Sequence, residues 1–244
     1  MKKRKITIDK KYILENAYDD FVHMLKYMPT PQRQVMYGNS GGPAGNYRLP
    51  GISDYQHPSN MPGSDYPFYG YFSTLVDNTT ILEIGTCHGG SAVMMSYNNT
   101  NKVITYDIYD LISGAINRKN IEFKIGNFME DKDINYDEID LMTLDVDPHD
   151  GIQEPPMIEF LENNWKGGLL VLDDIHNGSG MESFWQNIDR EKHGVYDMSD
   201  IGHAYHGTGL INFNRYFDLE VFSYDRDELE VKTCDPLYEN NCTA

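Results

Sequence analysis

The segment Ile81–Ala92 constrains the fold of this chain more than any other, because a strand, a tight turn and a helix follow one another within it. Its first part is apolar and β-branched, which is typical of a buried strand, and Glu83 stands near the end of that strand. Gly85 and Gly89 leave the following turn without side chains, so N–H groups at the start of the helix can approach a polar ligand closely. The segment therefore predicts an α/β fold with a ligand-binding turn.

The spacing within this turn distinguishes between two kinds of ligand. A turn that binds a pyrophosphate favours G-x-G-x-x-G, whereas this chain has E-x-G-x-x-x-G from Glu83 to Gly89. A carboxylate at the strand end suits a ligand with a cationic centre and an ammonium group better than one with a second phosphate. The turn therefore indicates S-adenosylmethionine as the cofactor and disfavours an NAD-dependent dehydrogenase.

Apolar strands and helix-like segments alternate from Tyr66 onward. The expected strands are Thr80–Ile84, Lys102–Asp107, Ile121–Ile125, Ile139–Asp145, Gly168–Asp173, Gly209–Asn214 and Leu219–Tyr224. The expected helices are Tyr69–Val76, Gly90–Tyr97, Leu111–Arg118, Pro156–Asn163 and Met181–Arg190. This alternation predicts a Rossmann-like, doubly wound and mostly parallel sheet of seven strands, covered by helices on both faces. Because only a short turn separates the last two strands, we expect them to form an antiparallel hairpin at one edge.

An N-terminal extension precedes this α/β unit. It begins with an expected amphipathic helix over Asp9–Met28 and continues as the irregular segment Pro29–Pro67, which is rich in Pro, Gly, Asn and Tyr. Long irregular segments are often functional, so residues 1–65 are interpreted as a helix followed by a substrate-side or lid segment, with a plain surface crossing as the alternative. The α/β domain is then expected over 66–234, and 235–244 form a C-terminal tail.

The charge of the chain disfavours one class of partner. Its 244 residues carry a formal net charge of −18, and so acidic a surface repels a phosphate backbone, which argues against DNA or RNA. No run approaches the ~18 apolar residues of a membrane helix, and no apolar stretch of an export signal follows the basic start. Three cysteines form no even disulfide framework, which favours the reducing cytoplasm. Assembly into a homo-oligomer stays open.

Acidic residues stand at the ends of four expected strands, and in a doubly wound sheet the ligand lies outside these ends. Glu83 ends the first strand, and Asp107 ends the second, 24 residues further along the chain. At that position a carboxylate can accept hydrogen bonds from both hydroxyls of a ribose. The alternative for Asp107 is a solvated side chain without a ligand. Asp145 and the pair Asp173–Asp174 end the fourth and fifth strands.

The segment Ile81–Ser96, followed by Val103–Asp107, resembles the class I S-adenosylmethionine-dependent methyltransferases, and among them the catechol-type, metal-dependent O-methyltransferases. The resemblance covers the chain from about Tyr69 to Asp174. It implies that the turn wraps the methionine part of the cofactor, that Asp107 holds the ribose, and that residues after the second and third strands border the adenine. The cofactor contacts implied in this way are Glu83, Gly85, Thr86, Gly89, Ser91, Asp107, Ile108, Asn127, Phe128 and Asp145.

The same resemblance implies a metal site. In the enzymes that this chain resembles, the positions of Asp145, Asp173 and Asp174 are metal ligands. Three carboxylates from neighbouring strand ends suit Mg²⁺, which prefers oxygen ligands. Such a cation would lower the pKa of a substrate hydroxyl and hold it in line with the methyl group. The alternative is that these acidic strand ends only cap helices.

A general base must also take the hydroxyl proton. The catechol enzymes use a Lys shortly after the fourth-strand Asp, whereas this chain has Asp147, His149 and Asp150 there. Sugar-modifying relatives place a His at about that position. His149 is therefore the first candidate for the base, followed by His176, with Asp147 as a further catalytic candidate.

The missing Lys also affects the expected substrate. It argues against catechol and favours a hydroxyl of a small molecule such as a sugar, glycan or other diol. The loop Asp200–Gly209 resembles the substrate-side loop of sugar and antibiotic O-methyltransferases, and its His203 and His206 are candidate substrate contacts. The alternatives are a metal-independent small-molecule methyltransferase with a His base and a catalytically silent module that binds the cofactor.

Overall fold

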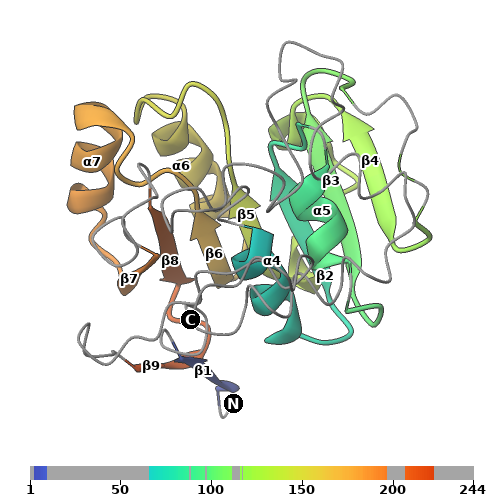
Figure 1. Ribbon diagram of the computed structural model, residues 1–244, viewed down its shortest axis with the longest axis horizontal. Coiled ribbons are helices and arrows are strands. Elements are labelled where there is room, and N and C mark those ends of the chain that lie inside the picture. The colour runs from blue at the N-terminus through green and yellow to red at the C-terminus, as the bar shows by residue number, and fades with distance from the viewer. Residues whose placement is uncertain are drawn as a thin grey trace, which may run out of the picture.

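A seven-stranded mixed sheet forms the centre of the molecule (Figure 1). The computed structural model describes residues 3–9, 66–87, 89–96, 98–111, 116, 118–196 and 207–222. The strands of the sheet are β2 (Thr80–Ile84), β3 (Lys102–Asp107), β4 (Ile121–Ile125), β5 (Ile139–Leu144), β6 (Gly168–Leu172), β7 (Lys192–Tyr196) and β8 (Thr208–Phe213). Their order is β4-β3-β2-β5-β6-β8-β7.

The first five of these strands are parallel to their neighbours. β8 runs antiparallel to both β6 and β7, so that β7 and β8 form an antiparallel hairpin at the edge. The Rossmann-like, mostly parallel sheet with an antiparallel edge hairpin is thereby confirmed. β6 is buried along its whole length, as expected for a strand covered on both faces.

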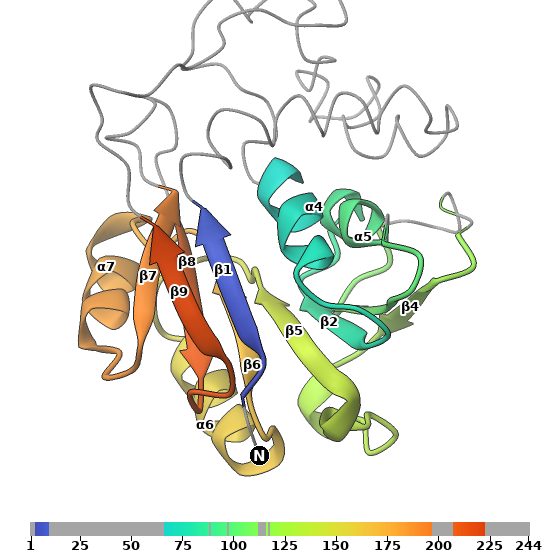
Figure 2. The ribbon, with the colours of Figure 1, turned by 90° about the horizontal axis from the view of Figure 1, so that it is seen from below.

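Helices flank this sheet. They are α4 (Tyr66–Thr74), α5 (Gly90–Met95), α6 (Glu154–Asn164) and α7 (Gly178–Asn187), together with the short 3-10 helices η3 (Phe128–Glu130) and η4 (Tyr136–Glu138). Figure 2 shows α4 and α5 on one side of the sheet and α6 on the other. Alternate residues of the central strands pack with α6 in one apolar core that includes Trp165, whose ring stacks on Phe213 at 5.0 Å.

The prediction of which two strands form the edge hairpin is wrong. The partner of β8 is β7, which was not predicted, and the expected partner forms β9 (Asp218–Phe222), which lies outside the seven-stranded sheet. Asn214 and Arg215 adopt left-handed backbone conformations with φ of 57° and 49°. The Asn212 side chain also accepts from Phe217 N at 3.1 Å and donates to Phe217 O at 3.0 Å. This turn directs the chain away from the sheet.

A second sheet has two strands within the part of the chain that the structure describes. β9 pairs in parallel with β1 (Lys5–Asp9), so the N-terminal strand lies beside a strand from the end of the domain (Figure 2). The expected helix over Asp9–Met28 lies outside the described residues beyond Asp9. So do nearly all of Pro29–Pro67, most of Leu111–Arg118, and the tail 235–244, and the domain boundaries stay predictions.

The other predicted helices and strands are observed, with ends that differ by up to three residues. In the described ranges, no helix has both the length and the apolar character that are needed to span a membrane.

Candidate active site

The strand order reverses between β2 and β5, and the crevice at such a point is where open α/β sheets bind ligands. The two strand ends approach each other closely at Gly85. This residue has a φ of +102°, and a Cβ there would lie 1.6 Å from the carbonyl oxygen of Asp145. Asp145 N also donates to Ile84 O at 2.9 Å. Only glycine fits at this point, so the turn after β2 is held directly against Asp145.

Glu83 lies at the base of this crevice and is 1% exposed. In the sheet register it stands between Thr105 of β3 and Thr143 of β5. Its Oε1 accepts a hydrogen bond from Ser91 Oγ, whereas its Oε2 has no hydrogen-bond partner within the described ranges. Burial raises the pKa of Glu83 to about 7 even though hydrogen bonds from the side chains of Ser91 and Thr105 lower it. Glu83 Oε2 is therefore a buried oxygen at the base of the turn that can accept a further hydrogen bond.

Asp107 is fixed against the same turn. Its Oδ2 accepts from Cys87 N at 2.8 Å, and its Oδ1 accepts from Tyr109 N at 3.0 Å. Each carboxylate oxygen can accept a further bond. The turn then enters α5 through Gly89, which has a left-handed backbone with a φ of 74°. The predicted methionine and ribose contacts are thus brought together by backbone hydrogen bonds between two neighbouring loops.

The predicted adenine contacts come from the ends of β3 and β4. Ile108 is 65% exposed beside Asp107, and Gly126 N donates to Asp107 O at 2.8 Å, which joins the two strand ends. Asn127 caps η3 by accepting from Met129 N at 3.1 Å. The ring of Phe128 is buried and packs edge-on against Phe160, so it anchors this loop to the core.

A hydrogen-bond network around Asp131 holds the loop after β4 in place. The carboxylate of Asp131 accepts from Tyr106 OH at 2.6 Å and from Lys124 Nζ at 2.8 Å. Burial and the hydrogen bond to Asp131 together raise the pKa of Tyr106 to about 12. The phenol therefore stays a donor at ordinary pH, and the segment after β4 is tied to both β3 and β4.

The other side of the crevice carries carboxylates that face one imidazole. His149 Nε2 lies 3.5 Å from Asp145 Oδ1, 3.5 Å from Asp147 Oδ1 and 3.4 Å from Asp174 Oδ2, and the His149 side chain is 11% exposed. A ring nitrogen among carboxylate oxygens acts as a donor, because its lone pair would face theirs. Three of the predicted residues after β5 and one after β6 are therefore brought together.

The predicted metal ligands are not arranged as a metal site. Asp145 and Asp174 face His149 Nε2, and Asp173 is buried, with its N–H donating to Leu144 O at 3.0 Å. Across the described ranges, no group of three or more His, Cys, Asp or Glu side chains is placed to hold a metal ion. The oxygen donors suit Mg²⁺ chemically, but their arrangement does not, so Mg²⁺ stays a prediction.

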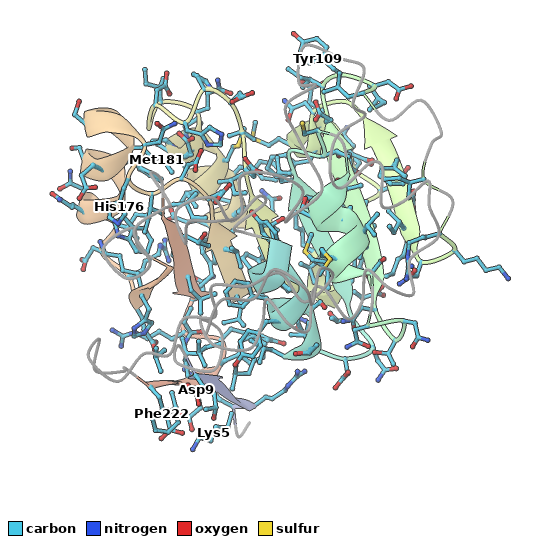
Figure 3. All side chains as sticks on the ribbon, viewed as in Figure 1. Lys5, Asp9, Tyr109, His176, Met181 and Phe222 are labelled. Carbon is cyan, nitrogen blue, oxygen red and sulfur yellow. The ribbon has the colours of Figure 1, made fainter. Side chains whose placement is uncertain are left out.

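His176 contacts α7. Its Nδ1 is hydrogen-bonded to Glu182 Oε2 of α7, and Glu182 Oε1 accepts from Gln186 Nε2 at 2.6 Å. Figure 3 shows His176 near one edge of the sheet and Tyr109, whose N–H donates to Asp107, toward the other. His203 and His206 lie outside the described residues.

One buried group at the site was not predicted. Glu154 begins α6 and is 1% exposed. Burial raises its pKa, although hydrogen bonds from the backbone of Glu154 and Gly151 and the nearby His149 lower it. In the sequence, an acidic residue just before two prolines predicts an exposed position in the first turn of a helix. No local signal indicates its burial.

Comparison with known proteins supports the fold. No protein-family model matches the sequence, and no curated protein is significantly similar to it. An O-methyltransferase from Bacillus cereus, solved in complex with SAH, has 16% identity over 82% of this chain and 98% of its own, with a TM-score of 0.53. TomG from Streptomyces achromogenes, an O-methyltransferase involved in tomaymycin synthesis and solved with SAM, has 12% identity over 83% and 98%, with a TM-score of 0.53.

A third structure, cofactor-bound Rv0187 from MTB, has 15% identity over 81% of this chain and 96% of its own, with a TM-score of 0.55. At these identities the similarity concerns the fold. The chain therefore has the Rossmann-like fold of the O-methyltransferase structures, as its sequence predicted.

Proposed function

We propose that the protein is an S-adenosylmethionine-dependent O-methyltransferase that methylates a hydroxyl of a small molecule. The observation that carries this proposal is the arrangement at the ends of β2 and β5, where Gly85 holds the turn against Asp145 and the Asp107 carboxylate is fixed against Cys87 N. The same fold occurs in structures solved with SAM or SAH. We further propose the cytoplasm as its compartment, from its cysteine content.

The residues present fit this cofactor. Gly85 and Gly89 leave the backbone accessible, and the partnerless Glu83 Oε2 is an acceptor at the base of the turn. We assign the methionine part to the Glu83–Gly89 turn, the ribose to Asp107, and the adenine to the residues around Ile108. When bound, S-adenosylmethionine supplies an electrophilic methyl group. The role of these residues is to hold it in one orientation, which is the main contribution a protein can make to a displacement at carbon.

On the acceptor side we assign proton removal to His149. Its Nε2 faces the three aspartates, so Nδ1 is the ring nitrogen that would accept the hydroxyl proton. The aspartates would stabilise the positive charge that then develops on the ring, as the buried carboxylate does in a Ser-His-Asp triad. His149→Ala should abolish transfer and leave cofactor binding intact.

We propose a sugar, glycan or other diol as the methyl acceptor. The proposal rests on the absence of a Lys shortly after Asp145. It also rests on the polar side chains of Asp145, His149 and Asp174 after β5 and β6. It is tested by transfer of a radiolabelled methyl group from S-adenosylmethionine to a panel of sugars, glycans and diols. Transfer to amines or thiols alone would contradict it.

The cofactor assignment has its own test. Calorimetry should detect binding of S-adenosylhomocysteine and none of NADH, because the turn lacks the glycine spacing for a pyrophosphate. Binding of NADH alone would overturn the proposal. A protein that binds S-adenosylhomocysteine but transfers no methyl group to any acceptor would instead be the silent cofactor-binding module.

Magnesium assistance is tested separately. EDTA should abolish the transfer and Mg²⁺ should restore it if the metal takes part, and Asp145→Asn should then lose metal dependence while the protein stays folded. Mn²⁺ uptake followed by electron paramagnetic resonance gives a reading that needs no acceptor. Transfer that is unaffected by EDTA would favour the metal-independent alternative, with His149 as the base.

A further inference from the structure

We infer that a backbone contact between Gly151 and Gly180 positions His149 in the active site. One glycine lies in the loop after β5 and the other in the first turn of α7, and neither was among the predicted site residues. The inference rests on the proposed function, because it concerns the group that takes the hydroxyl proton. It assigns Gly151 and Gly180 as positioning residues that do not themselves touch the substrate.

The contact is too close for any side chain. A Cβ on Gly180 would lie 2.1 Å from the carbonyl oxygen of Asp150, and a Cβ on Gly151 would lie 2.5 Å from the carbonyl oxygen of Gly180. Gly151 also has a left-handed backbone with a φ of +74°. A carbon atom added on either side meets backbone, which cannot rotate away as a flexible side chain can. The loop would therefore have to move as a whole.

The His149 loop is tied together internally, so a shift at Gly151 would reach His149. Gln153 Nε2 donates to Asp147 O at 2.9 Å, and His149 N donates to Val146 O at 3.2 Å. Ile152 N donates to Asp150 Oδ1 at 3.0 Å, which closes the turn next to Gly151. These bonds connect His149 with the start of the loop and connect the start of the loop with its end at Gln153.

The opposite loop is linked to Gly180 in a similar way. Asn177 N donates to Asp174 O at 2.9 Å, and Gly178 N donates to His176 O at 2.9 Å, so the first turn of α7 continues directly from Asp174. Of the three carboxylates that face His149, Asp145 and Asp147 lie on the chain segment that leads into its own loop. The 3.4 Å contact from Asp174 Oδ2 to His149 Nε2 is the one that bridges the two loops.

The glycine contact thus sets the distance between Asp174 and His149. An added methyl group at Gly180 would separate the loops, lengthen that bridging contact and turn the imidazole away from its place. Misplacement of a catalytic group by about 1 Å can lower a rate by about 100-fold. Cofactor binding should be unaffected, because the residues to which we assign its methionine, ribose and adenine parts, Glu83–Gly89, Asp107 and Ile108, lie at the ends of β2 and β3.

Two matched pairs of variants test this. Gly180→Ala is compared with Gly194→Ala in β7, where a Cβ meets nothing within 4 Å. Gly151→Asn is compared with Gly178→Asn, because Gly178 has a similar φ of +77° with open space around its Cβ. Asn tolerates the left-handed conformation better than most residues, so the second pair separates the close contact from backbone strain.

The readout is the pair of ring ¹⁵N resonances of His149 at one fixed pH, assigned with His149→Gln. Both contact variants should shift these resonances, whereas both controls should leave them at the wild-type positions. Affinity for S-adenosylhomocysteine should stay within about twofold in all four, and once an acceptor is identified kcat should fall about 10- to 100-fold in the contact variants only.

Each other outcome has a defined meaning. Unchanged His149 resonances in a folded contact variant would overturn the inference, as would a parallel loss of S-adenosylhomocysteine affinity. If Gly180→Ala does not fold, Gly151→Asn decides. Failure of both to fold, with both controls folded, would also overturn it, because the contact would then serve folding. A wild-type protein that binds no S-adenosylhomocysteine refutes the proposed function, while the resonances still test the contact.

Discussion

The two sides of the crevice are built in different ways. On the side that we assign to the cofactor, hydrogen bonds join residues of the turn and of the neighbouring loop: the Asp107 carboxylate accepts from Cys87 N and Tyr109 N, and Ser91 donates to Glu83. On the acceptor side, carboxylates face one imidazole across two loops, with Asp174 on one and His149 on the other. The first arrangement depends on the backbone of a turn, and the second on how two distant segments dock.

This difference predicts different responses to substitution. A change on the cofactor side should affect binding or the fold of the turn itself. A change on the acceptor side should alter the position of His149 with little effect on binding.

The largest effect is expected for Gly85→Ala, because Gly85 joins the two sides. Its Cβ would overlap the Asp145 carbonyl, at 1.6 Å, in a left-handed backbone. We expect a loss of about 3–5 kcal/mol of unfolding free energy, measured by denaturant unfolding. Gly126→Ala is the control, because its φ of +142° is also positive but its Cβ meets nothing within 4 Å. Equal losses in the two variants would attribute the effect to backbone strain alone.

Glu83→Gln should change the pH dependence of stability. The folded-state pKa of Glu83 is raised to about 7 from 4.5, so its stabilising contribution is full below about pH 4.5 and is lost as the pH rises through about 7. The shift corresponds to at most about 3 kcal/mol. Glu83→Gln should therefore remove this decline and be the more stable protein at pH 8. An identical decline in both proteins, measured without cofactor, would contradict the assignment.

Asp107→Ala should weaken binding of S-adenosylhomocysteine by about 10- to 100-fold, because hydrogen bonds to a charged group contribute about 1.5–3 kcal/mol. Calorimetry measures this loss. Asp137→Ala removes the same charge at the opposite, amino end of the sheet and should bind as the wild type does. Unchanged affinity in Asp107→Ala would refute the ribose assignment.

Glu154→Gln should have the smallest effect, and it should stabilise the protein. Burial raises the pKa of Glu154, so the carboxylate form is disfavoured in the folded state and stability is lost as the pH rises through that pKa. Removing the charge should therefore raise the free energy of unfolding more at high pH than at low pH. Destabilisation at pH 8 would mean that the buried carboxylate has a partner that stabilises its charge.

The sequence predicted the β2–β4 half of the sheet more accurately than the β7–β8 edge. The ends of β2, β3 and β4 agree with the prediction, because these segments are short, apolar and bounded by turn residues. β7 was missed, because Lys192–Tyr196 shows no alternation of apolar and polar residues. The hairpin partner of β8 was wrong, because the turn at Asn214 and Arg215 leads out of the sheet.

The amino-acid sequence alone was enough to predict the fold class and the turn that we assign to the cofactor. Both depend on local properties, namely the burial preference of short apolar strands and the backbone freedom of Gly85 and Gly89. Only the tertiary structure decided which carboxylates face His149 and that Glu154 is buried. These environments arise where segments that are far apart in the sequence contact each other, as Gly151 and Gly180 do. A contact between loops from different strands leaves no periodic or local signal along the chain.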